Sequence, residues 1–404
     1  MVVLSKLQLL CDFPFIKSCR PLHFSGHQHC SANAIMCFLN AARACTKYYV
    51  PVYILQLALV GAKNLNQEKF LEIFLGYLRS VIYGGVFPMA ASGTLCLYLT
   101  LFGRIDVKTL LTIGVMVGVT IFCETKRNRR LNSYMISTLA LEVMVNELEA
   151  KNLITRSPLR DTLKFMAING LVMYFLARKK LKSLNFWFYD IKPIKEKAPD
   201  DNVENIQKCT HQDNCTNFLK EGFKKYFFIG YGWNLIKIIM KKSALMIKKP
   251  KLIPSFIVKL ENLKFGAVLG LYAVIYRYIM CNLVKIDSVQ SAQRRAVHSG
   301  LAGVLAGSTY IIEPNLQFGL TALVTLLQIF YENLKETTFN ENFWEKVPGA
   351  ELCFIVMVSY LNICYIANTV DMQRANIKFI YDTFSGNIAS KFRTVILREM
   401  KLIQ

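Results

Sequence analysis

Histidine and cysteine residues near the N-terminus form a pattern that could bind a soft metal ion. The segment HFSGHQHC places His23, His27, His29 and Cys30 close together. Neutral imidazole and thiolate groups are ligands of zinc and copper. The spacing matches no zinc-finger pattern, so we expect no metal site, and His27, His29 and Cys30 remain the candidates if one exists. The alternatives are unmetallated thiols and reversible acylation of cysteines close to a membrane helix.

Three charged residues are associated with apolar runs. Glu124 and Glu313 each end a glycine-containing run, and Arg277 lies inside another run. Ionisable residues at membrane depth cost free energy and are often functional. The position of each glutamate at the edge of its run favours an interfacial carboxylate paired with a nearby Lys or Arg. Arg277 could extend to the interface, pair with Glu142 or Glu351, or line a polar pathway, and the sequence does not choose among these.

The chain carries none of the common catalytic or nucleotide-binding motifs. The patterns G-x-x-x-x-G-K-[ST], H-E-x-x-H and G-x-S-x-G do not occur, and neither does the Rossmann glycine pattern. We therefore expect a protein that is not an enzyme, with no catalytic residues and no cofactor.

The composition is typical of a membrane protein. The 404 residues include 49 Lys and Arg against 27 Asp and Glu, a net charge of +22, and 53% are hydrophobic. Soluble domains are about 25% charged, whereas this chain is 19% charged and gathers its apolar residues into runs. The 27 Phe and 19 Tyr exclude a disordered chain. The basic residues lie between apolar runs and form no single polar face, which argues against nucleic-acid binding.

The apolar runs predict membrane-spanning helices. A bilayer core of about 30 Å requires roughly 20 apolar residues per helix. Residues 81–102, 264–284 and 350–370 meet this length clearly. With the shorter runs, the sequence predicts an all-α, polytopic transmembrane bundle of about ten helical segments. The shorter runs are 48–62, 110–123, 131–148, 162–177, 223–240, 296–312 and 316–334.

The two halves of the chain resemble each other. Residues 114–124 read GVMVGVTIFCE and residues 303–313 read GVLAGSTYIIE, with five identities in eleven positions. Upstream, the run at 81–102 can be laid over the run at 264–284 with Gly85 on Gly270 and Cys96 on Cys281, an offset of 185. These similarities predict that the bundle is built from two duplicated halves.

Each half contains a glycine pair spaced by four residues, Gly114 with Gly118 and Gly303 with Gly307. In lipid, small residues at this spacing let helix backbones approach closely. We expect these pairs to act in simple helix packing.

The predicted organisation has five parts. A Cys- and His-containing segment (1–47) precedes a first membrane half (48–191). A polar linker (192–217) leads to a second, translocase-like membrane half (218–372), and a basic tail (373–404) ends the chain.

Five stretches that run through most of the chain are similar to one known family. They are YYVPVYILQLAL from Tyr48, YMISTLALEVM from Tyr134, DNCTNFLKEGFKKYFFIGY from Asp213, NLKFGAVLGLYAVIYRY from Asn262 and HSGLAGVLAG from His298. This is the transmembrane protein 135 family, also called a peroxisomal membrane protein. The family begins with a Cys/His-rich segment, which the group Cys19, His27, His29 and Cys30 resembles. The later half also resembles the four-helix import-translocase family of the mitochondrial inner membrane, which has glycine-zipper helices.

The resemblance implies a multi-pass protein of peroxisomal and mitochondrial membranes, associated with mitochondrial division and lipid handling. The expected partners are the lipid bilayer, anionic lipids through the basic loops at 178–182 and 241–251, and proteins of organelle division. The first alternative is a transporter or translocase subunit with a polar path near Arg277, Glu124 and Glu313. The second is a metal or redox sensor that uses the N-terminal Cys/His cluster.

Overall fold

The computed structural model describes eleven parts of the chain, and all their secondary structure is α- or 3₁₀-helical. No described residue lies in a β-strand, so the predicted all-α class holds for the described chain. The chain forms two compact units. Unit 1 is Met1–Ile154 with Glu345–Gln404, and unit 2 is Thr155–Trp344. The described residues are 23, 29–60, 66–103, 107–178, 187–189, 214–248, 251, 253–286, 292–337, 348–367 and 393–394.

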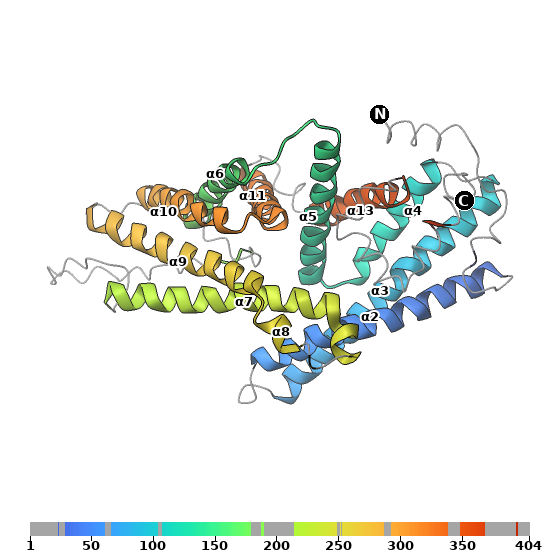
Figure 1. Ribbon diagram of the computed structural model, residues 1–404. Helices are drawn as coiled ribbons and strands as arrows, with labels where there is room; N and C mark the ends of the chain where they lie inside the picture. The colour runs from blue at the N-terminus through green and yellow to red at the C-terminus, as the bar shows by residue number, and fades with distance from the viewer. Residues whose placement is uncertain are drawn as a thin grey trace. The chain divides into compact units, whose positions relative to one another are not determined.

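Unit 1 is a helix bundle built on the long hairpin of α2 and α3 (Figure 1). Helix α3 begins after Asn66, whose side chain accepts a hydrogen bond from the Lys69 amide, and it ends at Gly103 with a φ of 65°. Glycine is favoured at such a left-handed helix end. Helices α4 and α5 both pack against α13. The elements are α2 (Cys30–Val60), α3 (Gln67–Phe102), α4 (Val107–Val119), η3 (Thr120–Cys123), α5 (Lys126–Ala150) and α13 (Gly349–Ala367).

Unit 2 contains a second long hairpin, formed by α7 and α9. Helix α10 packs against both α6 and α9, and α11 packs against α6. Its core is rich in aromatic residues, including the short segment Trp187 to Tyr189. The elements are α6 (Pro158–Arg178), α7 (Cys215–Lys248), α8 (Ile253–Ile257), α9 (Leu260–Ile286), α10 (Ala292–Gly307), η5 (Ser308–Ile312) and α11 (Leu316–Thr337).

The two hairpins repeat the same contacts at a constant offset. A Cβ atom built on Gly85 would lie 2.7 Å from the Phe38 ring, and one built on Gly270 would lie 2.9 Å from the Phe223 ring. Both members of the contact are shifted by the same offset of 185 in the sequence (38 to 223, 85 to 270). The α2–α3 hairpin therefore corresponds to the α7–α9 hairpin, and each is followed by a helix, a 3₁₀ turn and another helix.

The glycine pair of unit 1 lies against the helix that ends the second half. A Cβ atom on Gly114 would lie 2.6 Å from Ser359 Cα, and one on Gly118 would lie 2.7 Å from Ile355 Cα. Because these partners are backbone atoms, only glycine allows α4 to approach α13 this closely.

The glycine pair of unit 2 lies against the helix that ends the first half. A Cβ atom on Gly303 would lie 2.8 Å from Met173 Cγ, and one on Gly307 would lie 3.0 Å from Met166 Cα. Helix α6 therefore occupies in unit 2 the place that α13 occupies in unit 1. Each half of the sequence contributes its last helix to the other unit, an arrangement that we call the helix exchange.

The helix exchange makes the compact units differ from the predicted division into halves 48–191 and 218–372. The chain leaves unit 1 after Ile154 and returns at Glu345, so each unit combines residues from both halves. Most of the predicted linker, 192–213, lies outside the described residues, as does most of the predicted tail, 373–404.

Two helices in the described part of the chain are long and apolar enough to cross a membrane. They are Gln67–Phe102 and Pro254–Val284, and they contain the predicted runs 81–102 and 264–284. Two shorter apolar helices, Lys108–Cys123 and Gly349–Tyr365, fall below the length of a span. This supports association with a membrane and leaves a bundle of about ten spans as a prediction.

Candidate functional site

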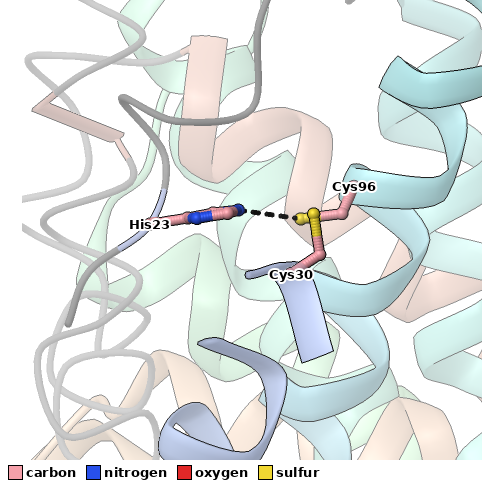
Figure 2. A group of neighbouring side chains, drawn as sticks. All are labelled: His23, Cys30 and Cys96. Carbon is pink, nitrogen blue, oxygen red and sulfur yellow. Dashed lines mark hydrogen bonds between the residues drawn. The ribbon is translucent and has the colours of Figure 1, made fainter. Parts of the chain in front are cut away.

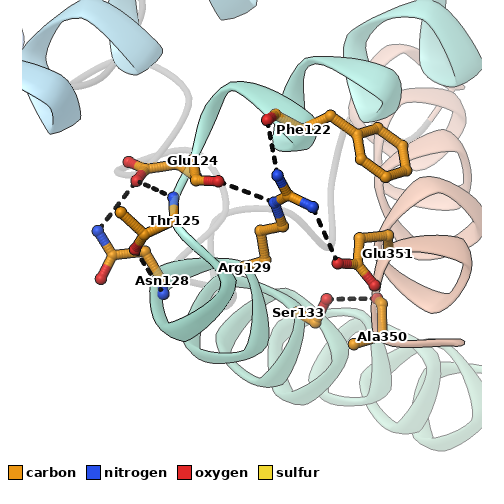
Figure 3. A network of polar contacts seen from close by, with 8 residues as sticks. All are labelled: Phe122, Glu124, Thr125, Asn128, Arg129, Ser133, Ala350 and Glu351. Atoms are coloured by element: carbon orange, nitrogen blue, oxygen red, sulfur yellow. Dashed lines mark hydrogen bonds and ion pairs between the residues drawn. The ribbon is translucent and has the colours of Figure 1, made fainter. Parts of the chain in front are cut away.

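Glu124 is held at the junction between η3 and α5 (Figure 3). The residue is only 1% exposed. The carboxylate oxygen Oε2 accepts hydrogen bonds from Asn128 Nδ2 at 2.9 Å and from the Thr125 amide at 3.3 Å. Thr125 in turn caps α5, because its Oγ1 accepts from the Asn128 amide. A negative charge is stabilised at a helix N-terminus, so the start of α5 satisfies this buried carboxylate.

Arg129, in the first turns of α5, joins three elements of unit 1 (Figure 3). Its Nε donates to the Glu124 carbonyl oxygen at 2.8 Å, and its Nη2 donates to the Phe122 carbonyl oxygen at 2.9 Å. Its Nη1 lies 3.5 Å from Glu351 Oε1 on α13. The expected ion pair between the Glu124 carboxylate and a neighbouring cation is not found among the described residues: Arg129 contacts the Glu124 carbonyl, and its ion pair is with Glu351. We call this set of contacts the arginine clamp.

Glu313 occupies the equivalent turn of unit 2, after η5, but its surroundings differ. Its Oε2 is buried and has no hydrogen-bond partner among the residues that the structure describes. Burial raises the pKa of the Glu313 carboxyl, and the nearby Glu261 raises it further, while Lys264 and Lys237 oppose the change. This turn therefore lacks the close donors that surround Glu124.

Phe318 stands where unit 1 has Arg129, five residues after the glutamate in each case. Its ring centroid lies 5.2 Å from that of Phe165 on α6 and 6.3 Å from that of Tyr310 in η5. The first turn of α11 is therefore joined to the exchanged helix by aromatic contacts, where unit 1 uses the arginine clamp.

Two hydrogen-bonded pairs of polar side chains lie in the interior of unit 2, at successive turns of α9. Asn169 on α6 donates to the Gly303 carbonyl at 2.5 Å and accepts from the Tyr272 hydroxyl at 3.0 Å. Further along α9, the Tyr276 hydroxyl and Ser299 Oγ are 2.6 Å apart. All these side chains are buried. Hydrogen bonds of this kind hold helices together in an apolar environment. We call Asn169, Tyr272, Tyr276 and Ser299 the polar line.

Arg277 follows the polar line on α9 and faces α7. Its Nη1 donates to the Phe218 carbonyl, and its guanidinium carbon lies 4.1 Å from the centre of the Phe218 ring. A Cβ atom on Gly222 would lie 2.8 Å from the same guanidinium carbon. The two acidic partners considered from the sequence, Glu142 and Glu351, belong to unit 1, where Glu351 takes part in the arginine clamp. Arg277 therefore contacts a carbonyl and a ring on α7 and interacts electrostatically with Tyr189, while no hydrogen bond to its buried Nε is found among the described residues.

The three predicted intramembrane polar residues do not meet at one place within a unit. Glu124 belongs to unit 1, and the other two belong to unit 2. The charge of Lys264 acts on Glu313, and Arg277 is thirteen residues further along α9 (264 to 277). At 1.5 Å per residue, Arg277 lies about 20 Å along α9 from Lys264, and therefore far from the surroundings of Glu313. Sequence reasoning missed the polar line between them. Its signal was the pair Tyr272 and Tyr276, one helical turn apart on an apolar helix.

Of the three metal candidates predicted from the sequence, the structure describes His29 and Cys30. His27 lies outside the described residues, and His29 is exposed immediately before α2. Cys30 lies beside His23 and Cys96. Cys96 lies inside the predicted apolar run 81–102 and is not among the metal candidates. The register of the α2–α3 hairpin is the signal that could have paired it with Cys30.

No protein-family model matches the chain, and no solved structure matches it either. The residues and contacts of the two units are therefore the basis on which its function is inferred.

Proposed function

We propose that the chain is a multi-pass membrane protein in which ten helices, α2 to α7, α9 to α11 and α13, form the bilayer-embedded bundle. The observation that carries this proposal is the apolar outer surface of helices that also pack in the core. Helix α10 exposes Val297, Leu301 and Leu305, four residues apart. Helix α6 exposes Leu159 and Leu163 at the same spacing. In a soluble bundle these outward positions carry polar residues.

The bilayer explains why apolar residues occupy both faces of these helices. The inner face of α10 is closed by its glycine pair against α6, and the outer face carries leucines that are exposed among the described residues. Exposed in water, a stripe of this kind would form a large apolar patch. In hydrocarbon it is the expected surface, and the internal hydrogen bonds of each helix satisfy the backbone.

We also infer that the protein belongs to the transmembrane protein 135 family and acts in peroxisomal and mitochondrial membranes. In this proposal it is not an enzyme. It organises membranes in mitochondrial division and lipid handling. The five similar stretches, the duplication and the net charge of +22 support this assignment. Basic residues at 178–182 and 241–251 would attract anionic lipid head groups by about 1 kcal/mol each when close to the surface. Most of these side chains lie outside the described residues.

Localisation of the tagged full-length chain tests both parts of the proposal. We expect it to coincide with peroxisomal and mitochondrial membrane markers and to stay in the membrane fraction after extraction with alkaline carbonate. A protease site inserted within 192–213 should be cleaved from one side of the membrane only. Extraction by carbonate would contradict the embedded bundle. A secretory or plasma-membrane pattern would contradict the organelle assignment.

Cells that lack the protein provide the test of its role. We expect altered mitochondrial length and lipid content, and rescue of both by the wild-type chain. A chain in which the lysines at 241–251 are replaced by glutamine should remain in the membrane and rescue poorly. Full rescue by this variant would contradict a role for this basic segment, which the sequence predicts as a loop and of which 241–248 form the end of α7.

A transporter or translocase subunit is the second candidate function, and the polar line of unit 2 favours it. Buried hydroxyl and amide groups at successive turns of one helix can line a path for a polar solute. In proteoliposomes, Tyr276→Phe and Arg277→Leu should then reduce flux of a lipid or metabolite, while Tyr278→Phe, which changes an exposed hydroxyl on the same helix, should not. Equal flux in all three variants would leave the polar line a packing feature.

A further inference from the structure

One imidazole and two thiol groups converge at one end of the α2–α3 hairpin (Figure 2). The groups are His23, Cys30 and Cys96, and one potential ligand atom from each lies within 4.8 Å of the others. His23 Nε2 is 3.6 Å from Cys96 Sγ. Cys96 is 4% exposed, and the other two are partly buried. The group is therefore a compact cluster of soft ligands at the edge of the core of unit 1.

The fold of the hairpin positions this cluster. Cys30 is the first residue of α2, and Cys96 lies near the C-terminal end of α3. Because the two helices run in opposite directions, these ends are neighbours. One turn further into the hairpin, Asn33 Nδ2 donates to Ser92 Oγ at 2.8 Å, which fixes the register of the two helices. The two thiols are thus held on a rigid element, and His23 approaches them from the preceding segment.

The distances suit a tetrahedral metal ion. With zinc bonds of about 2.3 Å to sulfur and about 2.05 Å to nitrogen, tetrahedral angles separate a sulfur and a nitrogen ligand by about 3.6 Å. The same geometry separates two sulfur ligands by about 3.8 Å. The observed 3.6 Å between His23 Nε2 and Cys96 Sγ equals the first value. The distance between the two sulfur atoms is at most 4.8 Å, which is compatible with the second value.

We propose that His23, Cys30 and Cys96 bind one Zn²⁺ ion. Two thiolates and one neutral imidazole are borderline-soft ligands that select zinc over magnesium or calcium. Three protein ligands leave the fourth tetrahedral position to water or to a small ligand. The ion joins the segment before α2 to both helices of the hairpin, so its binding stabilises the folded unit. The site is independent of the membrane function proposed above.

The second half offers an internal comparison. Cys215 is the first residue of α7 and Cys281 lies near the end of α9, and each follows its counterpart in the first hairpin at the same offset of 185 (30 to 215, 96 to 281). At this offset from His23 the sequence has Lys208. A lysine stands at the position of the imidazole ligand, so the three-ligand set of unit 1 is not repeated at this offset, and we expect one zinc ion per chain.

Metal analysis of the full-length chain, purified in detergent without a polyhistidine tag, tests the proposal. We expect about one zinc per chain by mass spectrometry. After exchange with Co²⁺, we expect the ligand-field and thiolate charge-transfer bands of a tetrahedral site. Cys96→Ser and His23→Gln should each weaken zinc binding at least about tenfold. Removing only the hydrogen-bond partner of a metal ligand lowers metal affinity by this factor, and removing the ligand itself has a larger effect. Cys123→Ser, which changes an exposed thiol in η3, should retain the metal.

His23→Gln keeps the test valid if the buried Cys96→Ser variant fails to fold, because His23 precedes the helices. Added zinc should raise the melting temperature of the wild-type chain and leave that of His23→Gln unchanged. A chain that takes up neither Zn²⁺ nor Co²⁺ would overturn the proposal, as would full metal content in both ligand variants. Binding of Cu(I) without Zn²⁺, or a disulfide between Cys30 and Cys96 in protein taken from cells, would overturn the zinc assignment.

Discussion

The helix exchange predicts a disulfide bond that can form only if α6 packs in unit 2. A Cβ atom built on Gly170 of α6 lies 3.5 Å from Val304 Cβ on α10. Disulfide bonds in proteins have Cβ–Cβ distances of about 3.5–4.5 Å. Gly170→Cys combined with Val304→Cys should therefore cross-link under mild oxidation, with no movement beyond a few tenths of an ångström, since the Gly300 carbonyl is 3.2 Å from the new Cβ.

The size of the effect follows from the length of chain that the bond closes. Residues 170 and 304 are 134 positions apart, the same separation as that of Asn169 and Gly303. The loss of chain entropy in the unfolded state would stabilise the fold by about 5 kcal/mol at most. Engineered disulfides commonly give less, so we expect an increase of about 2–4 kcal/mol in the free energy of unfolding.

The assay compares two cysteine pairs. With a protease site within 192–213, cleavage should leave the two fragments of the Gly170–Val304 pair joined on a non-reducing gel and separate after reduction. Val115 is the counterpart of Val304 in the first half (115 to 304, an offset of 189). Val115→Cys with Gly170→Cys, tested with a protease site placed instead in the exposed turn at 151–155 that separates these two positions, should not cross-link. A cross-link in this second pair and none in the first would refute the helix exchange, and the single-cysteine variants control for the native thiols.

Three further predictions concern single residues and are measured by unfolding in detergent. Gly114→Ala places a methyl group 2.6 Å from Ser359 Cα and should cost about 1–3 kcal/mol, whereas Gly93→Ala, with nothing within 4 Å, should gain about 0.5–1 kcal/mol. Equal effects would contradict the close packing of α4. Tyr272→Phe leaves its amide partner on α6 without this donor and should cost about 1–3 kcal/mol. Burial raises the pKa of Glu313, so its ionisation destabilises the folded chain as pH rises from the unfolded value near 4.5 through the higher folded pKa. Glu313→Gln should therefore melt higher than wild type at neutral pH and equally at pH 4, and a constant difference would exclude this titration.

The helices and their repetition could be predicted from the sequence, because both depend on local patterns. The apolar runs at 81–102 and 264–284 lie inside long helices, and their offset of 185 recurs in the contacts of both hairpins. The helix exchange could not be predicted. The glycine pairs show that α4 and α10 approach another helix closely, but α6 and α13 carry no local feature that decides between two equivalent seams.

The polar contacts were less predictable than the helices, because partners come from distant parts of the chain. Glu124 and Arg277 were identified as unusual residues, yet their partners depend on which helix lies opposite. A guanidinium group that contacts the Phe218 carbonyl and ring leaves no pattern in the sequence. Cys96 lies inside an apolar run, and only the register of the α2–α3 hairpin shows that it lies beside Cys30.

The helix exchange also constrains how the two halves could diverge after duplication. The first turn of α5 and the helix that it must fit, α13, lie in different halves, so a change in one has to match a residue more than 200 positions away. Arg129 and Glu351, separated by 222 positions, form such a match in unit 1. On α6, Asp161 follows Pro158 by three residues, as Glu351 follows Pro348, and it pairs with Arg156 of the preceding loop at 3.1 Å. Both exchanged helices therefore carry an acidic residue near their start. It pairs across two helices with Arg129 in unit 1 and locally with Arg156 in unit 2, where Phe318 stands at the position of Arg129.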